Sequence, residues 1–283
     1  MQNNILQRTR KTSSEFLYGA SSVIAALEGN RRRIKTLFVK ETSSSPSIAL
    51  AISLAAKRQI PVTKTHVASL DKHSESRPHN GLVLETSPLK PERLVALGHI
   101  KYNDNQQLCY DLLYSLKESV RFEKVSPSGV WIALDKISDP QNLGSIIRTA
   151  KFFGVDAIIK TENDSCPLSP ITSKSSAGAM ENMDIYTVTN LPKFLEASTL
   201  NGWECVGTDI NDSENRTDID DYKIDGPTII VLGSEGRGIR SVVSQKCSRN
   251  LFIQGGNERL DSLNVGVATG ILLHKLCKNI QLK

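Results

Sequence analysis

The amino-acid sequence predicts an α/β protein with two domains, and three observations support this prediction. The chain has 283 residues, more than the roughly 100–200 residues of a typical domain. Short apolar runs alternate with segments of helical periodicity in two separate stretches. Between these stretches lies a segment rich in Pro, Gly and polar residues, as is typical of a linker. We therefore expect a tail or targeting remnant at residues 1–15, a small α/β domain at 16–86, a linker at 87–128 and a larger, mainly parallel α/β domain at 129–283.

The predicted first domain alternates strands and helices. Its first helix covers Ala20–Glu28 and ends at Gly29. The following elements are, in order, a strand, a helix, a strand, a helix and a strand, at Thr36–Lys40, Ile48–Arg58, Pro61–Lys64, Val67–Lys72 and Leu82–Glu85. This βαβαβ order is typical of a small three-layer α/β domain.

The expected linker contains few periodic segments. Pro88, Pro91 and Gly98 interrupt it, the polar run YNDNQQ follows at Tyr102–Gln107, and we predict one helix at Leu108–Leu116. The turn sequence SPSG at residues 126–129 marks the next domain boundary.

The second domain begins with an apolar strand, Val130–Leu134, a polar turn, Asp135–Asn142, and a helix, Leu143–Phe153. The helix has an apolar stripe at i, i+3, i+4 and i+7, and Asn142 is placed to cap it. The later strands are predicted at Ala157–Lys160, Ile185–Val188, Trp203–Thr208, Thr228–Leu232 and Asn250–Ile253. The later helices are predicted to start at Ser169-Pro170, to cover Leu191–Leu200, and to run from Asn264 to about Cys277. Alternating strands and helices predict a mainly parallel sheet with helices on both faces.

Composition excludes several classes of protein. Hydrophobic residues make up 39% and charged residues 23% of the chain, which is typical of a globular protein, and no apolar run reaches the roughly 18 residues of a membrane helix. The five cysteines are scattered and form no CxxC, and the five histidines form no HExxH. These patterns favour a reducing compartment and predict no metal site.

Charge is unevenly distributed along the chain. Residues 1–126 contain 19 Lys and Arg against 11 Asp and Glu, a net charge of +8, whereas residues 127–283 contain 16 against 19, a net of −3. A basic first half favours a polyanionic partner such as RNA or DNA, with a solvated basic surface as the alternative. Residues 1–15 contain Arg8, Arg10 and Lys11 but no acid before Glu15, which is compatible with a mitochondrial targeting segment or a disordered tail.

The first motif is DPQNLGSIIRTAKFFG at Asp139–Gly154. A strand–turn–helix junction explains Asp139, Pro140 and Gly144 without any function, because Gly144 allows close packing. Arg148 is different, because it lies about 140° around the helix from Leu143, off the apolar stripe. It is either a plain surface residue or one that holds a phosphate or a ribose oxygen with its planar set of donors.

The second motif is LGSEGRGI at Leu232–Ile239. Three glycines directly after a buried strand let the backbone approach a ligand closely. The spacing is not the dinucleotide-binding fingerprint, and the chain contains no P-loop sequence. Glu235 in this turn would repel phosphates but suits a cationic or hydroxyl-bearing ligand.

The third motif is LDSLNVGVATGILL at Leu260–Leu273. The helix from Asn264 is apolar nearly all round, which indicates burial on more than one side, in a core or additionally at a subunit interface. Ser262 and Asn264 lie at its start, and capping accounts for one of them but hardly both.

Taken together, in this order and at these spacings, the three motifs resemble the SpoU family of RNA ribose 2′-O-methyltransferases, within the SPOUT superfamily. The resemblance covers about Val130–Lys278. The first domain is similar to the small α/β RNA-binding domain that precedes the catalytic domain in many members, through Phe16–Gly29, Ile60–Thr65 and His79–Glu85. The resemblance implies that the end of the parallel sheet is tied in a deep trefoil knot, that the chain binds S-adenosyl-L-methionine without a metal, and that it acts as a homodimer.

The resemblance also implies roles for particular residues. It places Arg148 beside the target hydroxyl, where a guanidinium is a poor base but can stabilise a developing alkoxide and grip the adjacent phosphate. The residues expected to orient the ribose and its neighbours are Asn142, Glu235, Ser262 and Asn264. The residues expected to bind the cofactor are Gly233, Ile253, Leu263, Thr208 and Gly236.

Within the family, five features are similar to the fungal mitochondrial large-subunit rRNA methyltransferases. They are EFLYG, IPVTKT, HNGLVLETSPLKP, the polar insert between the domains and DSCPLSPITSKSSAGAM at Asp164–Met180. This similarity implies a guanosine of that rRNA as the substrate and the mitochondrial matrix, or otherwise the cytoplasm, as the location. Two alternatives stay open: a tRNA ribose methyltransferase, and a non-catalytic RNA-binding ribosome-assembly factor, against which the intact set of site residues argues.

Overall fold

The computed structural model describes residues 14–42, 45–115, 121–125, 128–208, 216–256 and 262–277, with side chains in all of these ranges except 121–125. The chain divides into two compact units, Met1–Leu89 and Lys90–Lys283. Each unit has a central sheet of its own.

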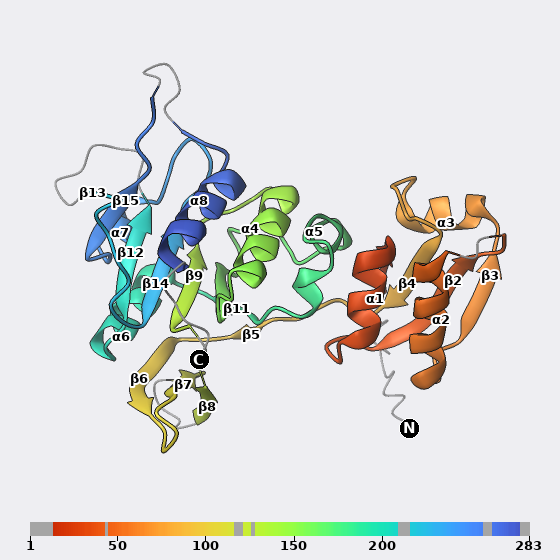
Figure 1. Ribbon diagram of the computed structural model, residues 1–283, viewed down its shortest axis with the longest axis horizontal. Helices are drawn as coiled ribbons and strands as arrows, with labels where there is room; N and C mark the ends of the chain where they lie inside the picture. The colour runs from red at the N-terminus through yellow and green to blue at the C-terminus, as the bar shows by residue number, and fades with distance from the viewer. Residues whose placement is uncertain are drawn as a thin grey trace, which may run out of the picture. The chain divides into compact units, whose positions relative to one another are not determined.

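The first unit contains a mixed four-stranded sheet in the order β1-β4-β2-β3 (Figure 1). Its strands are β1 Glu15–Tyr18, β2 Ile34–Lys40, β3 Val62–Thr65 and β4 Leu82–Thr86, and its helices are α1 Ala20–Glu28, α2 Pro46–Lys57 and α3 Val67–Ser74. β2 and β3 are parallel, whereas β4 is antiparallel to both β1 and β2. Strand β1, which was not predicted from the sequence, pairs with the edge of β4 that does not pair with β2.

Alternation along the strands separates the first unit into three layers. Leu37 and Val39 pack in one cluster with Val23 of α1 and Ile48 of α2. Phe38, between them, packs with Leu70 of α3 in a second cluster. Successive side chains of a strand point to opposite faces, so the sheet is covered by α1 and α2 on one side and by α3 on the other. The predicted three-layer domain is confirmed.

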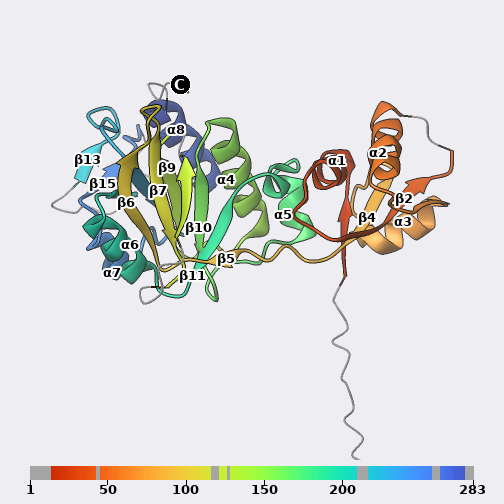
Figure 2. The same cartoon turned by 90° about the horizontal axis from the view of Figure 1, so that it is seen from below.

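The second unit contains an eight-stranded sheet in the order β13-β15-β12-β14-β9-β10-β11-β5, and all of its pairs of strands are parallel (Figure 2). The strands are β5 Glu92–Arg93, β9 Val130–Leu134, β10 Ala157–Thr161, β11 Ile185–Val188, β12 Glu204–Thr208, β13 Arg216–Asp218, β14 Thr228–Leu232 and β15 Arg249–Phe252. The helices are α4 Pro140–Phe152, α5 Pro170–Ser175, the short 3₁₀ helix η1 Ala179–Glu181, α6 Leu191–Leu200, α7 Ser241–Ser244 and α8 Val265–Cys277. The predicted parallel sheet is therefore confirmed.

Both faces of this sheet are buried, which explains why its central strands are continuous apolar runs. Trp131 and Ala133 of β9 pack with Phe194 of α6 and Val243 of α7 on one face. The alternate residues of β9 point to the other face, where α4 packs closely against both α5 and α8. Gly144 makes one of these contacts possible, because a Cβ there would lie 1.9 Å from Ser175 Oγ.

Residues of the expected linker form regular structure in the second unit. β6 Ala96–Tyr102, β7 Leu108–Leu113 and β8 Arg121–Val125 make an antiparallel three-stranded sheet. The prediction of a helix at Leu108–Leu116 is wrong, because Tyr110 and Leu112 alternate towards the core of the second unit and the backbone pairs with β6 and β8. Trp131 Nε1 donates a hydrogen bond of 2.7 Å to Tyr110 Oη, and burial raises the pKa of Tyr110, which keeps its hydroxyl protonated.

The segment that would complete the implied trefoil knot includes residues 257–261, which lie outside the described residues, so the knot stays a prediction. Among the described residues, no helix combines the length and the hydropathy that a membrane span requires.

Candidate active site

A cavity of about 600 Å³ lies at the carboxyl ends of β12, β14 and β15 and against α8. Its lining includes all five residues that the sequence predicts to bind a cofactor, namely Thr208, Gly233, Gly236, Ile253 and Leu263. Val265, Ala268 and Leu272 of α8 form an apolar wall, because their spacing places them on one side of the helix. Ligands bind in this position in open parallel sheets, and the volume suits a nucleoside-sized molecule.

The glycine turn after β14 forms one wall of the cavity and is closed by its own backbone. Ser234 and Gly238 exchange two hydrogen bonds, Ser234 N to Gly238 O at 3.1 Å and Gly238 N to Ser234 O at 3.0 Å. A Cβ on Gly233 would lie only 2.1 Å from the carbonyl carbon of Gly238. Gly233 is therefore required by the turn itself, so a side chain there would distort the backbone and not merely fill the cavity.

Three of the predicted catalytic residues are joined by hydrogen bonds beside the cavity. Asn264 Nδ2 donates to Asn142 Oδ1 at 3.0 Å and also to Glu235 Oε1. Glu235 Oε1 accepts a further bond of 3.3 Å from the backbone N–H of Val265. The first motif contributes Asn142, the second Glu235 and the third Asn264, so the fold brings together residues up to 122 positions apart.

Capping explains Asn264 only in part. Its Oδ1 accepts hydrogen bonds from the backbone N–H groups of Gly266 at 2.9 Å and Val267 at 3.3 Å, which caps α8. Its Nδ2 donates to Asn142 of the first motif and Glu235 of the second. Asn142 is not the cap of α4, contrary to the sequence prediction. Asp139 has that position, with Oδ1 accepting from Gln141 N at 3.1 Å, because Pro140 is favoured at the first helical position.

The other two predicted catalytic residues, Ser262 and Arg148, are not part of this hydrogen-bonded group. Ser262 is exposed and lines the cavity. Arg148 is exposed on α4, as the sequence predicts, and forms no hydrogen bond or ion pair with the rest of the described chain. Its side chain is therefore available for a ligand, and its removal would leave no cavity in the core.

Sequence reasoning missed a buried ion pair beside the glycine turn. Asp135, whose side chain is 1% exposed, binds Arg240 with an Nη2–Oδ1 distance of 2.7 Å. The sequence did contain one indication of this pair, because Asp135 directly follows the buried strand β9 and an unpaired buried charge would be costly.

The described residues show no metal cluster, and burial raises the pKa of several cysteine thiols. No group of three or more His, Cys, Asp or Glu side chains within them is arranged to hold a metal ion. All five cysteines are free. Burial raises the pKa of Cys205 to about 11 and that of Cys247 to about 12, so both thiols are protonated near neutral pH.

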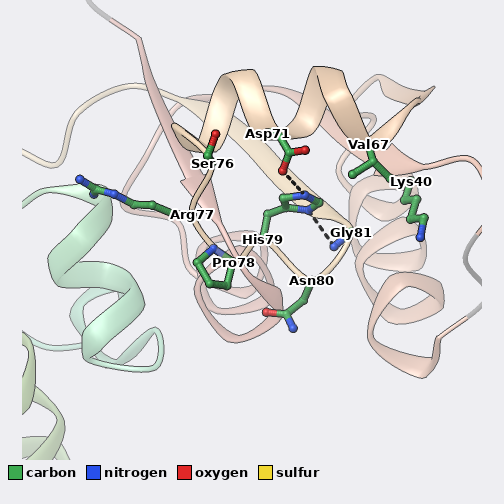
Figure 3. A pocket seen from close by; sticks show the side chains of 9 residues that line it. All are labelled: Lys40, Val67, Asp71, Ser76, Arg77, Pro78, His79, Asn80 and Gly81. Carbon is green, nitrogen blue, oxygen red and sulfur yellow. Dashed lines mark hydrogen bonds and ion pairs between the residues drawn. The ribbon is translucent and has the colours of Figure 1, made fainter.

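A second cavity, of about 400 Å³, lies in the first unit between β2, α3 and the loop before β4 (Figure 3). His79 Nδ1 accepts from Gly81 N at 3.0 Å, so its proton is on Nε2, which faces Asp71 Oδ1 at 3.2 Å. Asn80 has a φ of +54° and Ser76 a φ of +59°, an uncommon conformation for such residues. The His79 imidazole therefore connects this loop, through Gly81, to Asp71 of α3.

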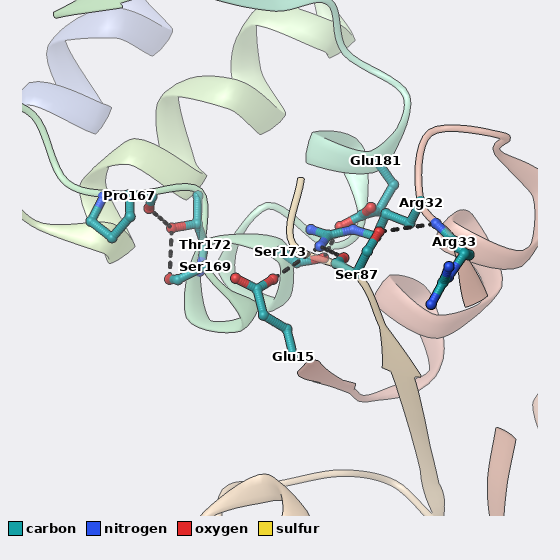
Figure 4. Close-up of polar contacts among 9 residues, drawn as sticks. All are labelled: Glu15, Arg32, Arg33, Ser87, Pro167, Ser169, Thr172, Ser173 and Glu181. Carbon is teal, nitrogen blue, oxygen red and sulfur yellow. Dashed lines mark hydrogen bonds and ion pairs between the residues drawn. The ribbon is translucent and has the colours of Figure 1, made fainter. Parts of the chain in front are cut away.

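The basic cluster at Arg31–Arg33 and Lys35 is less exposed than its sequence indicates. Arg32 is buried and donates bonds of 3.0 Å to Glu15 Oε2 and to Ser87 O (Figure 4). Lys35 binds Glu85 at 3.2 Å. Within this cluster only Arg31 and Arg33 are exposed, whereas Arg32 is buried and Lys35 is half-buried, so the basic charge of this run does not all face solvent.

The segment around α5 is also organised by short polar side chains. Ser169 caps α5 by accepting from Thr172 N at 3.4 Å, as the Ser169-Pro170 pair predicts. Within the same unit, buried Ser173 donates a bond of 2.8 Å to Glu181 (Figure 4). These bonds hold α5 in the position where Gly144 of α4 contacts it.

Comparisons with known proteins match both units. The SpoU rRNA Methylase family model matches residues 129–274, and the model described as RNA 2′-O ribose methyltransferase substrate binding matches residues 16–92. The chain is 34% identical to "rRNA methyltransferase 1, mitochondrial" of Schizosaccharomyces pombe over 95% of this chain and 92% of that protein. It is 33% identical to "23S rRNA (guanosine-2'-O-)-methyltransferase RlmB" of Pseudomonas aeruginosa over 93% and 96%.

Other similar proteins differ more in length or in sequence. The chain is 35% identical to "rRNA methyltransferase 1, mitochondrial" of Dictyostelium discoideum, over 86% of this chain but 47% of that protein, so it spans about half the length of that relative. An AdoMet-bound rRNA methyltransferase structure from Sinorhizobium meliloti has the same fold, with a TM-score of 0.69, 22% identity and coverage of 95% and 88%. With one family model matching the unit that contains the cavity and relatives matching nearly the whole chain, this protein belongs to the SpoU rRNA methylase family.

Proposed function

We propose that this chain transfers a methyl group from S-adenosyl-L-methionine to a ribose 2′-hydroxyl of ribosomal RNA. The observation that supports this most strongly is the cavity at the carboxyl ends of β12, β14 and β15, with the bonded side chains of Asn142, Glu235 and Asn264 beside it. The family match to the same unit agrees with this reaction.

The residues of the cavity fit the proposed cofactor. Apolar side chains from α8 can contact an adenine ring, and Gly255 and Gly256 leave open space, since a Cβ on either would meet nothing within 4 Å. When bound, S-adenosyl-L-methionine supplies an electrophilic methyl group on a sulfonium leaving group. No metal is required for that transfer in this proposal.

The polar side chains would align the target ribose. Glu235 Oε1 accepts from both Asn264 and Val265, which fixes the carboxylate in one orientation, and Asn264 in turn fixes Asn142. We assign to Arg148 the stabilisation of negative charge on the 2′-oxygen and a grip on the neighbouring phosphate, because a guanidinium donates hydrogen bonds but does not lose its proton. Holding the reacting groups in line provides catalysis by proximity.

The names of the relatives support a proposed substrate and location. Their names specify mitochondrial rRNA methyltransferases and a 23S rRNA guanosine-2′-O-methyltransferase. We propose a guanosine of mitochondrial large-subunit rRNA as the target, with the first unit binding RNA and the protein working in the matrix. A tRNA substrate, or RNA binding without catalysis, would be the alternative outcomes of the assay below.

We also propose that the protein acts as a homodimer. On α8, Val267 is 53% exposed and Ile271 is 39% exposed, and Phe152 of the neighbouring helix α4 is 82% exposed. Large apolar side chains exposed on two packed helices are typical of an interface.

The proposed function is tested by filling the cavity. Ala268 lies on the stripe of α8 that lines it, so Ala268→Phe should abolish binding of S-adenosylhomocysteine in calorimetry and methylation of an rRNA fragment. Ala49→Phe, on an exposed position of α2, is the matched control and should leave both unchanged. Normal cofactor binding by Ala268→Phe would place the ligand elsewhere, and activity lost with EDTA and regained with a divalent ion would contradict the metal-free reaction.

A further inference from the structure

We infer that Asp135 and Arg240 are positioning residues for the cofactor turn, in addition to the residues named above. The inference rests on the proposed function, because it concerns how the turn at residues 233–239 is held in its ligand-binding shape. Neither residue lines the cavity, so both would act through the backbone of the turn.

The contacts of Asp135 join the two ends of this turn. Its backbone N–H donates to Leu232 O, the last residue before the turn, at 2.8 Å. Its Oδ2 accepts from the backbone N–H of Arg240, the first residue after the turn, at 2.9 Å. One residue at the end of β9 therefore fixes both the start and the end of the segment that lines the cavity.

The Arg240 side chain completes the attachment. Nε donates to Asp135 Oδ1 at 2.8 Å, and Nη2 lies 2.7 Å from the same oxygen. The Asp135 carboxylate is 1% exposed, whereas the Arg240 side chain is 36% exposed. A buried carboxylate with three donors from one residue has a single well-defined geometry, as bidentate arginine pairs do.

The position of the turn determines the positions of the hydrogen-bonded side chains of Glu235, Asn264 and Asn142. Glu235 lies at the tip of the turn and binds Asn264 and the backbone N–H of Val265. Asn264 then binds Asn142 on α4. A shift of the turn by a fraction of an ångström would therefore be transmitted to three motifs, and small misplacements of reacting groups reduce rates strongly.

The competing explanation is that Asp135 and Arg240 only stabilise the fold. Substitutions that separate stability from ligand binding distinguish this explanation from a positioning role. Replacing a buried ion pair by well-packed apolar residues is often neutral or stabilising, whereas removing one partner is strongly destabilising. Apolar replacement of both partners should therefore preserve the fold but lose the directional bonds to the turn. Arg240→Lys keeps a cation beside the carboxylate but loses the planar set of donors.

The experiment uses the full-length protein with Arg240→Lys, the double variant Asp135→Val/Arg240→Met, and Lys246→Met as a control. Lys246 forms an ion pair with Glu196 near α7, with side chains 35% and 54% exposed. For each protein, Tm, the Kd for S-adenosylhomocysteine and the single-turnover methylation rate are measured. We expect Arg240→Lys to keep a Tm near that of the wild type, because its cation still neutralises Asp135. We expect it to bind S-adenosylhomocysteine about 10- to 100-fold more weakly, because the turn is displaced from its ligand-binding position.

The outcomes are distinct. Weaker binding at unchanged Tm in Arg240→Lys, with a normal Lys246→Met control, supports the inference. A double variant that keeps the wild-type Tm but loses affinity for S-adenosylhomocysteine supports it further. Wild-type affinity and rate in Arg240→Lys overturn the inference, as does a double variant with the wild-type Tm, affinity and rate. Failure of the unmodified protein to bind S-adenosylhomocysteine would instead overturn the proposed function, so the two failures can be told apart.

Discussion

At the scale of single residues, Asn264 shows how one side chain serves both folding and the site. Its carbonyl oxygen caps α8 through Gly266 and Val267, while its amide nitrogen binds Asn142 and Glu235. The two roles use different atoms of one amide, so a substitution that keeps the oxygen and removes the nitrogen separates them.

Asn264→Asp makes that separation. A carboxylate still caps the helix, but it cannot donate to Asn142 and places a like charge beside Glu235. We expect a Tm close to that of the wild type and a methylation rate about 10- to 100-fold lower, measured by thermal denaturation and single-turnover assay. Asn190→Asp at the cap of α6, where Oδ1 accepts from Lys193 N, is the control, and a normal rate in Asn264→Asp would leave Asn264 as a cap only.

Arg148 gives a second prediction, because its side chain is exposed and unbonded within the described chain. We expect both Arg148→Ala and Arg148→Lys to fold, to bind S-adenosylhomocysteine normally and to lose most methylation of an rRNA fragment. Lysine keeps the charge but not the bidentate geometry, so loss in both variants indicates that geometry matters. Near-normal single-turnover rates in Arg148→Ala would remove this residue from the mechanism and make Glu235 or Ser262 the next candidate.

Sequence reasoning at this scale succeeded where residue type alone was informative. The exposure of Arg148 followed from helical periodicity, and two polar residues at one helix start indicated that capping does not account for both Ser262 and Asn264. The bond between Asn264 and Asn142 spans 122 residues and could not be derived from local pattern. Asp135 and Arg240 were missed for the same reason, since a carboxylate and an arginine 105 residues apart reveal their pairing only in the fold.

At the scale of elements, the apolar runs of the second unit predicted its central strands because those strands are buried on both faces. Prediction failed for β1, whose partner β4 is distant in sequence, and for β7, which pairs with its neighbours β6 and β8. β7 alternates Tyr110 and Leu112 towards Trp131, but its polar surroundings obscured that alternation. Context of this kind routinely overrides local propensity.

On the last helix, α8, fewer apolar residues are exposed than the sequence indicated. The sequence showed a last helix that is apolar nearly all round, but its residues Val265, Leu272 and Leu276 are 6%, 2% and 5% exposed and belong to the interior of one chain. Val267 and Ile271 remain as exposed apolar residues on α8. The proposal of a dimer therefore depends on a narrower strip than the sequence indicated.

This strip allows a direct test. We expect the protein to be a dimer at micromolar concentration in light scattering, and Val267→Asp/Ile271→Asp to shift it to the monomer, because two buried charges would cost more than the contact provides. Leu200→Asp/Val242→Asp, which changes exposed apolar residues of α6 and α7, is the control and should stay dimeric. An unmodified protein that is strictly monomeric and active would contradict the proposal.

At the scale of the whole molecule, the chain combines a basic first half with a near-neutral second half that contains the cavity. The two units have separate sheets and separate cores. Division of labour between RNA binding and methyl transfer is consistent with this arrangement, and the charge difference is the part of it that the sequence alone could reveal. Which basic residues face solvent could not be predicted, because Arg32 looks the same as its neighbours until its partner Glu15 is known.

RNA affinity should therefore depend on the exposed members of the basic cluster. Replacing Arg31 and Arg33 by Gln, while leaving the buried Arg32 in place, should weaken binding of an rRNA fragment and flatten the plot of log K against log[salt]. If each arginine neutralises one phosphate, the slope should fall by roughly 1.4 to 1.8, since each contact releases about 0.7 to 0.9 counterion. Affinity for S-adenosylhomocysteine should not change.

The matched control removes the same charge from the other unit. Lys193 and Lys223 are exposed in the unit that contains the cavity, so Lys193→Gln/Lys223→Gln lowers the net charge by two without touching the basic cluster. A general effect of net charge would change the slope equally in both double variants, whereas a contact at Arg31 and Arg33 changes it only in the first. An unaltered slope in Arg31→Gln/Arg33→Gln would identify these arginines as solvated surface residues, and RNA binding would then have to be sought on other basic residues of the first unit, beginning with Lys40 and Arg77 at its cavity.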